Sequence, residues 1–439
     1  MPWYGELPER WKAKKISELF VERQTKVSDI NFAPLSVSKG GIVPQIATVA
    51  KSNAGDNRKL VQQGDFVINS RSDRRGSSGV SPHDGSVSLI NIVLEPRKPG
   101  NVRYYHYLLR SHPFIEEYYR NGRGIVADLW TTRYSEMKTI YLPLPPRDEQ
   151  DQIVRYLDWK VSRINKLINA KRRQIALLQE QKRAIIKDVL NEGTDKWKTP
   201  PLYSRYSVVL GKMLDSKKIT GKSSIPYLRN VDVQWGNINY SVLPNMDIYD
   251  NELERYTIKK GDILICEGGE AGRCAIVEEI DMIIGFQKAL HRLRPLYDNE
   301  NPRFFFYTML NAVAIGSFNT DKSTLLHLTG EKLRRYRFPM PTYSEQCSIA
   351  DYLDEQCGRI DKIANKINDE IALFTEYRIR LISDVVTGKL DVRGVTVPEY
   401  EIVEDVSEIN ELPDDKDTVK KSYAFRNDES DCELEEGAE

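Results

Sequence analysis

The chain has 439 residues and a formal charge of zero, with 64 Lys and Arg against 64 Asp and Glu. It contains no apolar run of about 18 residues, so we expect no membrane span, and we also expect no signal peptide. Its five cysteines form no CxxC pair, which favours free thiols in a reducing cytoplasm and argues against a zinc site.

The charge is distributed unevenly along the chain. Residues 401–439 carry 15 Asp and Glu against 4 Lys and Arg, whereas residues 1–400 carry 60 basic and 49 acidic side chains. The basic body is compatible with a polyanionic partner, although many proteins of similar charge bind no nucleic acid. We expect the acidic end of the chain, residues 390–439, to be a disordered and solvated tail because it is poor in aromatic residues.

The first globular segment is predicted to cover residues 1–145 and to combine helices with strands. Residues 64–69, which are Gly-Asp followed by a mainly apolar run, are expected to form a strand. The loop after this strand is rich in Arg, Ser and Gly; arginine can bond to guanine edges and to phosphates, and small residues let a nucleic-acid backbone approach closely. The duplication described below favours DNA contact over the alternative of an ordinary exposed basic loop. The candidate DNA-binding residues of this segment are Lys39, Arg71, Arg74, Arg75, Ser77 and Ser78.

Residues 146–192 are predicted to form one long helix. Apolar residues recur at steps that alternate between four and three, a period of about 3.5 that is typical of a coiled-coil seam rather than of a strand or a lone surface helix. These residues are Ile153, Leu157, Val161, Ile164, Ile168, Ile175, Leu178, Ile185 and Val189. Pro146, Asp148 and Glu149 mark the helix start, and Gly193 marks its end. A helix of roughly 44 residues is about 65 Å long, which is too long for one globular core.

Residues 193–201 are predicted to be a linker, and residues 202–341 a second globular segment of mixed helices and strands. Residues 261–266 repeat the Gly-Asp strand, but the loop that follows is less basic than its counterpart in the first segment. A shared frame with different loops predicts two different ligands. Because asparagine and glutamine can read adenine in the major groove, Asn230 and Gln287 are candidate base readers. The candidate DNA-binding residues of this segment are Arg229, Asn230, Arg273, Gln287, Lys288 and Lys322.

Residues 342–389 are predicted to form a second long helix that repeats the first. Residues 143–190 align without a gap with residues 339–386, with 19 identities over 48 positions, so equivalent contacts are expected in the two copies. Thr342 and Glu345 form the pattern of a capping box at the helix start. Because the second globular segment begins where the first helix ends, the two helices should run antiparallel. We therefore expect an α/β fold with two globular domains at opposite ends of two antiparallel coiled-coil helices, related by an approximate two-fold axis.

The sequence lacks the motifs of the common nucleotide-dependent and metal-dependent enzymes. It contains no GxxxxGK[ST] phosphate loop, no GxGxxG turn and no Asn/Asp-Pro-Pro-aromatic motif of an amino methyltransferase. Its five histidines lack HxxxH spacing, and it has no convincing cluster of acidic residues with a lysine for metal-assisted phosphodiester cleavage. We therefore expect no catalytic residue, no metal site and no cofactor in this chain.

Three features occur together in one order along the chain. They are residues 3–11 (WYGELPERW), the two Gly-Asp strands, and two Pro-x-Pro helix starts with Glu149-Gln150 and Glu345-Gln346. This combination resembles the specificity subunit of type I restriction-modification enzymes over roughly residues 1–390. In that family two target-recognition domains each read half of a split DNA sequence, and the helices form a spacer. Residues 197–201 depart from the family pattern because they lack a full copy of the amino-terminal signature.

The resemblance implies a non-catalytic, cytoplasmic DNA-recognition subunit with residues 1–145 and 202–341 as its target-recognition domains. It implies double-stranded DNA, two methyltransferase subunits and ATP-driven restriction subunits as partners, and no membrane. S-adenosylmethionine, ATP and Mg²⁺ are expected in the partner subunits. The candidate partner-binding residues on the spacer helices are Glu149, Gln150, Tyr156, Leu157, Glu345, Gln346, Tyr352 and Leu353.

Two other functions stay open on the sequence alone. The first is a coiled-coil scaffold that binds only proteins, without sequence-specific DNA binding; unlike loops on a repeated frame argue against it. The second is a solitary methyltransferase or nuclease, for which the sequence offers no cofactor or metal constellation.

Overall fold

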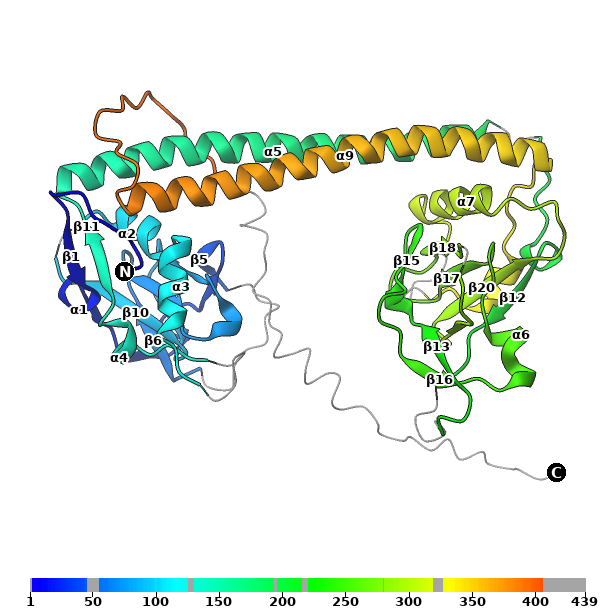
Figure 1. The fold of residues 1–439 in the computed structure, drawn as a ribbon, viewed down its shortest axis with the longest axis horizontal. Coiled ribbons are helices and arrows are strands. Elements are labelled where there is room, and N and C mark those ends of the chain that lie inside the picture. The colour runs from blue at the N-terminus through cyan, green and yellow to red at the C-terminus, as the bar shows by residue number, and fades with distance from the viewer. Residues whose placement is uncertain are drawn as a thin grey trace. The chain divides into compact units, whose positions relative to one another are not determined.

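The computed structural model describes residues 2–45, 55–98, 100–124, 130–192, 196–214, 220–278, 280–318 and 327–405. The chain divides into two compact units: unit 1 comprises Met1–Arg172 and Asn368–Glu439, and unit 2 comprises Arg173–Ile367. Each unit therefore combines one globular part with parts of both long helices (Figure 1). Among the described helices, none has both the length and the apolar character that a membrane span requires.

Unit 1 is built on antiparallel strands covered by short helices. Its strands are β1 (Lys12–Lys15), β2 (Phe20–Glu22), β3 (Lys26–Val27), β4 (Leu35–Ser38), β5 (Gly41–Pro44), β6 (Arg58–Val61), β7 (Phe66–Asn69), β8 (Ser78–Val80), β9 (Gly85–Ser88), β10 (Asn91–Pro96) and β11 (Tyr141–Leu144). Its short helices are α1 (Ile16–Leu19), α2 (Val102–Leu109), α3 (His112–Arg120) and α4 (Tyr134–Met137). The strands β2, β10, β7 and β8 form a four-stranded sheet in that order. Its main core joins Phe66 and Leu94 of this sheet to Tyr104 of α2 and Tyr118 of α3.

Unit 2 has a four-stranded sheet of the same design, with the order β12, β20, β17 and β18. Its strands are β12 (Tyr206–Leu210), β13 (Ser224–Leu228), β14 (Val233–Gln234), β15 (Asn237–Ile238), β16 (Asn245–Asp247), β17 (Ile263–Cys266), β18 (Cys274–Ile276), β19 (Gly285–Phe286) and β20 (Leu290–Pro295). Its short helices are α6 (Leu253–Tyr256), α7 (Pro302–Ala314) and α8 (Gly330–Arg335). Among the described strands, only β13 and β19 pair in parallel. Both units thus have the mixed content predicted from the sequence, but they are α+β rather than α/β, because crossover helices do not join neighbouring parallel strands.

The two four-stranded sheets agree in register as well as in order. Val67 of β7 pairs with Gly79 of β8, and the equivalent Leu264 of β17 pairs with Ala275 of β18. The strands predicted from the two Gly-Asp motifs are β7 and β17, at the centre of these sheets. The shared skeleton inferred from the sequence is therefore this four-stranded sheet.

The Gly-Asp motifs themselves form the turns that lead into β7 and β17. Gly64 and Gly261 have φ angles of 93° and 85°, a conformation that glycine adopts without strain. The Asp65 carboxylate accepts the backbone N–H of Gln62 at 2.8 Å, and Asp262 accepts the equivalent N–H three residues before it at 2.7 Å. The motif is thus a structural turn and not part of a binding site.

An entry strand before each sheet is also duplicated. β1 pairs with β11 so that Lys12 lies opposite Leu144. In unit 2 an isolated bridge places Lys198 opposite Met340, which is the equivalent register. Residues 197–201 therefore keep the strand pairing that follows the amino-terminal signature, although they carry little of the signature itself.

The long helices are α5 (Arg147–Asn191) and α9 (Tyr343–Val386). In unit 1 the apolar seam of α5 shares one core with α9. Lys171 forms an ion pair with Glu370, whereas Asn165, nearer the start of α5, accepts a hydrogen bond from Arg378 at 2.5 Å. Lower residue numbers in α5 therefore meet higher residue numbers in α9, so the helix segments of unit 1 run antiparallel.

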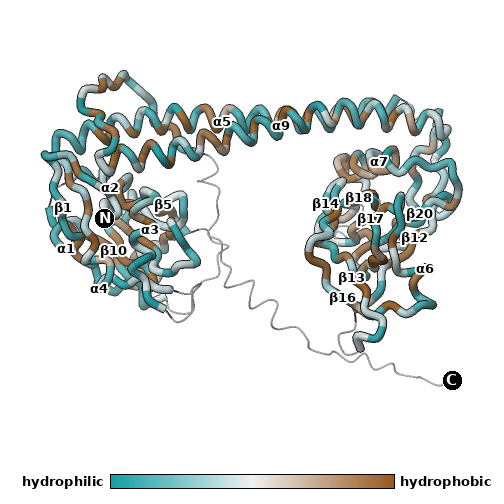
Figure 2. The backbone as a smooth tube through the Cα atoms, viewed as in Figure 1, coloured by the Kyte–Doolittle hydropathy of each residue, from teal (hydrophilic) through white to brown (hydrophobic). Residues whose placement is uncertain are grey.

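The helix segments of unit 2 pair in the same sense. Ile186 of α5 and Leu353 of α9 lie in one buried cluster, and Lys182 forms an ion pair with Asp361 at 2.7 Å. In Figure 2, apolar and polar residues alternate along both helices, as expected for helices that each bury one stripe. The antiparallel pairing predicted from the connectivity is therefore present within each unit.

Residues 389–405 follow α9 in unit 1 and lie against α5; we call this segment the C-terminal strap (Figure 1, orange). The Asn165 amide donates to the backbone carbonyl of Val403 at 2.8 Å, and Val392 is only 3% exposed. The prediction that a disordered tail begins at residue 390 is therefore wrong for the strap, because its backbone and apolar side chains find partners on α5. Residues 406–439, the rest of the predicted tail, lie outside the described residues.

Candidate nucleic-acid interface

The basic loop between β7 and β8 is held by local contacts. The Arg71 guanidinium makes two hydrogen bonds to Asp73, at 3.0 and 2.9 Å. Arg75 lies 5.4 Å from the centre of the Tyr119 ring and 3.4 Å from the Glu116 carboxylate. Its side chain is still 52% exposed. The loop thus presents Arg75 to solvent on an ordered frame.

The end of the same loop is less accessible than the sequence predicts. Arg74 is half-buried, and its carbonyl accepts the N–H of Ser77 at 3.0 Å. Ser77 is 6% exposed, and Ser78, the first residue of β8, is fully buried. Ser77 and Ser78 therefore expose little of their side chains, and their assignment as DNA contacts stays a prediction. The turn closes at Ser77, so the chain has already entered the sheet at this point.

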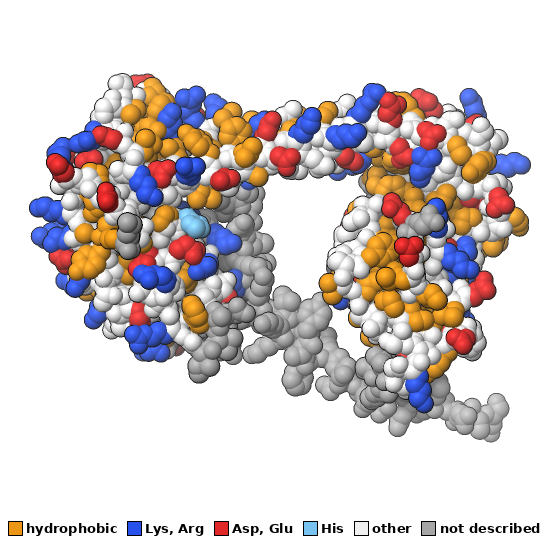
Figure 3. Space-filling model, in the orientation of Figure 1, with side chains coloured by type: hydrophobic (Ala, Val, Ile, Leu, Met, Phe, Trp, Pro, Cys, Tyr) orange, Lys and Arg blue, Asp and Glu red, His pale blue; other side chains and the backbone are white. Residues whose placement is uncertain are grey.

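Lys39 and Gly76 of the basic loop line the same cavity. It lies in the turn between β4 and β5, with its side chain exposed and its carbonyl bonded to the Arg110 guanidinium. A cavity of about 650 Å³ is lined by Lys39, Gly76, Arg103, His106 and Arg110, among others. Burial, aided by the charges of Arg110 and Arg103, holds the pKa of His106 well below its usual range, so its imidazole is neutral. In Figure 3, Lys and Arg side chains are interspersed with Asp and Glu on the visible face of this unit.

In unit 2, the predicted site residues converge although they lie far apart in the sequence. The Asn230 amide nitrogen donates to the carbonyls of Gly268 at 3.1 Å and Ala289 at 3.5 Å. The Asn230 amide oxygen accepts a bond from Arg273 at 2.9 Å. Asn230 therefore ties together the start of η5 (Asn230–Asp232) and the loops after β17 and β19.

These contacts decide which predicted residues of unit 2 can reach a ligand. The amide of Asn230 is occupied by the protein and the Arg273 side chain is only 14% exposed, so both have structural roles here, and their assignment as DNA contacts stays a prediction. Arg229 makes two hydrogen bonds to Asp232, at 2.9 and 2.8 Å. Gln287 is half-buried and Lys288 exposed, and neither side chain bonds to another described residue. Lys322 lies outside the described residues.

Most of the predicted partner-binding residues on the long helices are buried inside their own unit. The buried ones are Glu149, Gln150, Tyr156, Leu157, Gln346 and Leu353. Glu345 is exposed, and Tyr352 is 47% exposed. Tyr156 differs from its repeat counterpart Tyr352 because it shares a core with Val395 and Val397 of the C-terminal strap. Only Glu345 and Tyr352 could therefore meet a partner subunit without a rearrangement.

Polar contacts join the globular part of unit 1 to the start of α5. Asn101 caps α2 by accepting the N–H groups of Arg103 and Tyr104, at 3.0 and 3.1 Å, and its own N–H donates to Gln150 at 3.3 Å. Two turns further along α5, Asp158 accepts bonds from Arg103 at 2.6 Å and from the Tyr107 hydroxyl at 2.7 Å. This segment of α2 is thus attached to α5 at two points.

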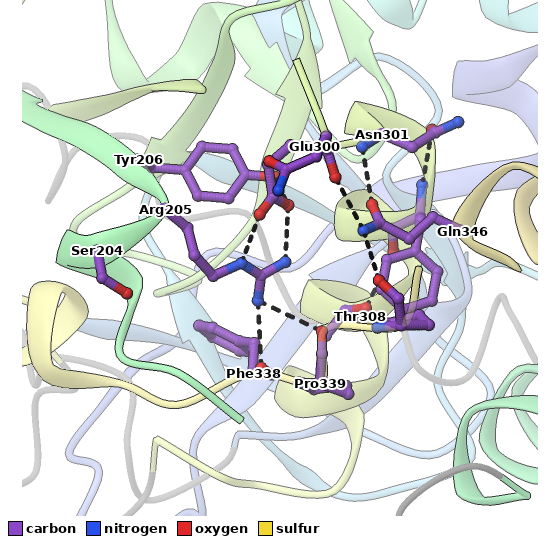
Figure 4. Close-up of polar contacts among 12 residues, drawn as sticks. Ser204, Arg205, Tyr206, Glu300, Asn301, Thr308, Phe338, Pro339 and Gln346 are labelled. Carbon is purple, nitrogen blue, oxygen red and sulfur yellow. Dashed lines mark hydrogen bonds and ion pairs between the residues drawn. The ribbon is translucent and has the colours of Figure 1, made fainter. Parts of the chain in front are cut away.

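Unit 2 repeats these contacts at the start of α9. Asn301 caps α7 by accepting the N–H groups of Arg303 and Phe304, and its own N–H donates to Gln346 at 2.8 Å (Figure 4). Asp354 accepts bonds from Arg303 at 2.5 Å and from the Tyr307 hydroxyl at 2.7 Å. The equivalent contacts expected from the sequence repeat are therefore found.

The two tyrosines of these contacts stay protonated and act as donors. Burial and the Asp158 carboxylate raise the pKa of Tyr107, and burial and the hydrogen bond to Asp354 raise the pKa of Tyr307. These tyrosines and the two capping asparagines are not among the residues predicted from the sequence. The repeated Asn-x-Arg pattern at Asn101 and Asn301, each before an aromatic-rich helix, is the signal that identifies them.

A buried ion pair adds to the attachment in unit 2. The Arg205 guanidinium makes two hydrogen bonds to Glu300, each at 2.7 Å, and the two side chains are 2% and 1% exposed. Arg205 also donates to the carbonyls of Phe338 and Pro339, at 3.1 and 3.3 Å (Figure 4). The pair therefore joins the start of β12 to the segment that leads into α9.

Among the described residues, no group of three or more His, Cys, Asp or Glu side chains is placed to hold a metal ion. Cys266, Cys274, Cys347 and Cys357 are free thiols. The available chemistry of the exposed loops is hydrogen bonding and positive charge.

Comparison with known proteins finds similarity to one family. Residues 206–373 match the model of the type I restriction modification DNA specificity domain. The chain is 20% identical over 428 residues to a Methanocaldococcus jannaschii protein assigned as the type I restriction enzyme MjaX specificity subunit, covering 89% of this chain and 96% of that protein. It is 22% identical over 198 residues to the type I restriction enzyme EcoBI specificity subunit of Escherichia coli, covering 45% of this chain and 40% of that protein.

The fold has a solved counterpart. A chain in a structure described as "Structural basis underlying complex assembly and conformational transition of the type I R-M system" is similar with a TM-score of 0.66 and 15% identity. The match covers 88% of this chain and all of the other. At 15% identity, this match shows that the two chains share a fold and shows nothing more.

The described residues contain one four-stranded skeleton twice, with unlike loops after β7 and β17. The chain is thus similar to type I restriction enzyme specificity subunits over most of its length, and residues 206–373 match the model of their DNA specificity domain.

Proposed function

We propose that this chain is the non-catalytic subunit that selects the DNA sequence in a type I restriction-modification complex. In this proposal the globular part of each unit reads one half of a bipartite, asymmetric target. The observation that carries it is the repeated four-stranded sheet with different loops after β7 and β17. Equal scaffolds with unequal reading loops suit a target with two unlike halves.

The loops supply the two kinds of contact that sequence recognition needs. Phosphate contacts from exposed basic residues account for affinity that falls with salt, and contacts to base edges account for discrimination. In unit 1 the exposed Arg75 is the strongest candidate for either contact, and in unit 2 Gln287 and Lys288 are the candidates that their own fold leaves available.

The long helices have the role of a spacer in this proposal. The antiparallel pairing within each unit supports a pair of helices that separates the two reading domains by a set distance. Two methyltransferase subunits and the restriction subunits would dock on this framework and would bind S-adenosylmethionine, ATP and Mg²⁺ themselves. The assembly would act in the cytoplasm.

The test is to produce the full chain with its methyltransferase partners and to sequence the methylated positions in cellular DNA. We expect one motif made of two unlike half-sites separated by a constant number of unread base pairs. Methylation without any sequence preference, or none at all with a folded complex, would favour the protein-only scaffold instead.

Arg75→Ala is expected to weaken recognition of one half-site. If Arg75 contacts a guanine, the loss is about 1–3 kcal/mol and the preference relaxes at a single position of the motif. If it contacts a phosphate, affinity falls at all sequences. The slope of log affinity against log salt concentration then decreases in magnitude by about one. Binding measured at several salt concentrations separates these results. Arg10→Ala, which removes another exposed arginine of unit 1, is the control.

Lengthening both helices is expected to change only the spacing of the half-sites. Seven residues inserted after Arg172 of α5 and seven after Ile367 of α9 add about 10 Å, or about three base pairs, while keeping the seam in register. The methylated motif should keep both half-sites and gain about three unread base pairs. If the half-site bases change while the gap stays constant, the spacer role is wrong.

A further inference from the structure

Each globular part is attached to its long helix by the same set of five residues, which we call the polar latch. In unit 1 the latch consists of Asn101, Arg103, Tyr107, Gln150 and Asp158. In unit 2 it consists of Asn301, Arg303, Tyr307, Gln346 and Asp354. These residues are shared by two units whose binding loops differ, so their role is common to both.

The latch has the geometry of a two-point attachment. Gln150 and Asp158 lie eight residues apart on α5, about 12 Å along the helix axis. Gln150 binds Asn101, at the start of α2, and Asp158 binds Tyr107, further along α2. The two contacts therefore lie at two separate points along both helices. One contact would let α2 swing on α5. Two contacts at this separation define its direction.

The contacts that make up the latch are directional, whereas the packing around it is not. Phe304 and Ile186 belong to the apolar cluster where α7 meets the long helices, and apolar contact alone tolerates small shifts of one helix along another. Hydrogen bonds to a carboxylate require short distances and a narrow range of angles. The Asp158 side chain is only 6% exposed, so little solvent screens its bonds, whereas Asp354 is 40% exposed and its bonds are more screened. The latch therefore sets the register that the apolar contact leaves free.

We propose that the two polar latches set the number of base pairs between the half-sites, by holding each reading domain at one angle on its helix. Asp158 and Asp354 are then positioning residues: they do not touch DNA but act through the domains that do. This inference rests on the proposed function. A shift of the reading loops by about 3.4 Å corresponds to one base pair, so a small change of angle is enough to alter the spacing that is read.

The experiment measures spacing directly. The full chain with its methyltransferase partners is given a DNA library in which the half-sites are constant and the number of base pairs between them varies. The variants are Asp158→Ala, Asp354→Ala and the double variant. Tyr107→Phe and Tyr307→Phe, which each remove only one hydroxyl, provide the same comparison if an alanine variant fails to fold.

For the natural chain we expect methylation at one spacing. In each single variant, methylation at spacings one base pair longer or shorter should rise relative to the original spacing by about ten-fold, with a larger rise in the double variant, while the half-site bases stay the same. Asp148→Ala removes an exposed carboxylate of α5 that pairs with Arg10, and it should leave the spacing unchanged.

Two results overturn the inference and differ from each other. If folded variants lose methylation equally at every spacing, the latch contributes only to stability and does not set the spacing. If the natural chain itself shows no bipartite preference, the proposed function fails, and the inference fails with it.

Discussion

Arg205→Ala is expected to lower the free energy of unfolding of unit 2 by about 3–5 kcal/mol. The substitution leaves the Glu300 carboxylate, whose side chain is 1% exposed, without the guanidinium that balances its charge. It also removes a donor from the carbonyls of Phe338 and Pro339 at the entry to α9. A buried charge without its partner is strongly destabilising, whereas the intact pair adds less than its Coulomb energy suggests. Urea denaturation followed by tryptophan fluorescence measures the change.

Two variants distinguish charge burial from loss of side-chain volume. Arg205→Met combined with Glu300→Gln keeps similar volumes, leaves no charge inside, and retains an acceptor for the Tyr206 hydroxyl, which donates to Glu300 at 2.9 Å. We expect this double variant to recover most of the lost stability. Arg335→Ala breaks a pair with Glu331 whose side chains are 77% and 75% exposed, and it should change stability by less than about 1 kcal/mol. Equal losses in the single and double variants would contradict the charge argument.

Asp405→Ala is expected to detach the C-terminal strap and to destabilise unit 1 by about 3 kcal/mol. The Asp405 carboxylate, 2% exposed, forms ion pairs with Arg172 of α5 and, at 3.1 Å, with Arg378 of α9, whose side chain is 9% exposed. The residue of α5 that meets Arg378 is the neutral Asn165. Asp405 therefore supplies the negative charge that balances Arg378 between the two helices. In the sequence repeat, Asn165 of α5 corresponds to Asp361 of α9. In unit 2 Asp361 carries the negative charge itself and pairs directly with Lys182.

Limited proteolysis together with chemical denaturation tests this prediction. The variant should be cleaved within residues 389–405 at protease concentrations that leave the natural chain intact, and its free energy of unfolding should fall. Glu404→Gln changes the neighbouring exposed carboxylate and is the control. An Asp405→Ala chain that is cleaved no faster than this control would show that apolar contacts such as those of Val392 hold the strap by themselves.

The sequence alone determined the elements whose signal is local or repeated. Each long helix follows from a stripe of apolar residues with a period that only a helix places on one side. The antiparallel pairing follows from chain connectivity. The strands β7 and β17 follow from short apolar runs after a Gly-Asp turn, and the repeat of 196 residues predicts that contacts recur, as those of Gln150 and Gln346 do.

Only the tertiary structure decided which polar side chains remain available for binding. Ser78 and Asn230 have residue types suited to DNA contact, yet Ser78 is buried in a strand, and Asn230 joins the start of η5 to the loops after β17 and β19. Tyr156 and Tyr352 occupy equivalent positions in the repeat, but Tyr156 is buried in a core that also includes residues of the C-terminal strap, whereas Tyr352 is 47% exposed. Burial depends on segments distant in the chain, and a local residue pattern carries no information about them. The strap itself is held by contacts such as the bond from Asn165 to Val403, 238 residues away.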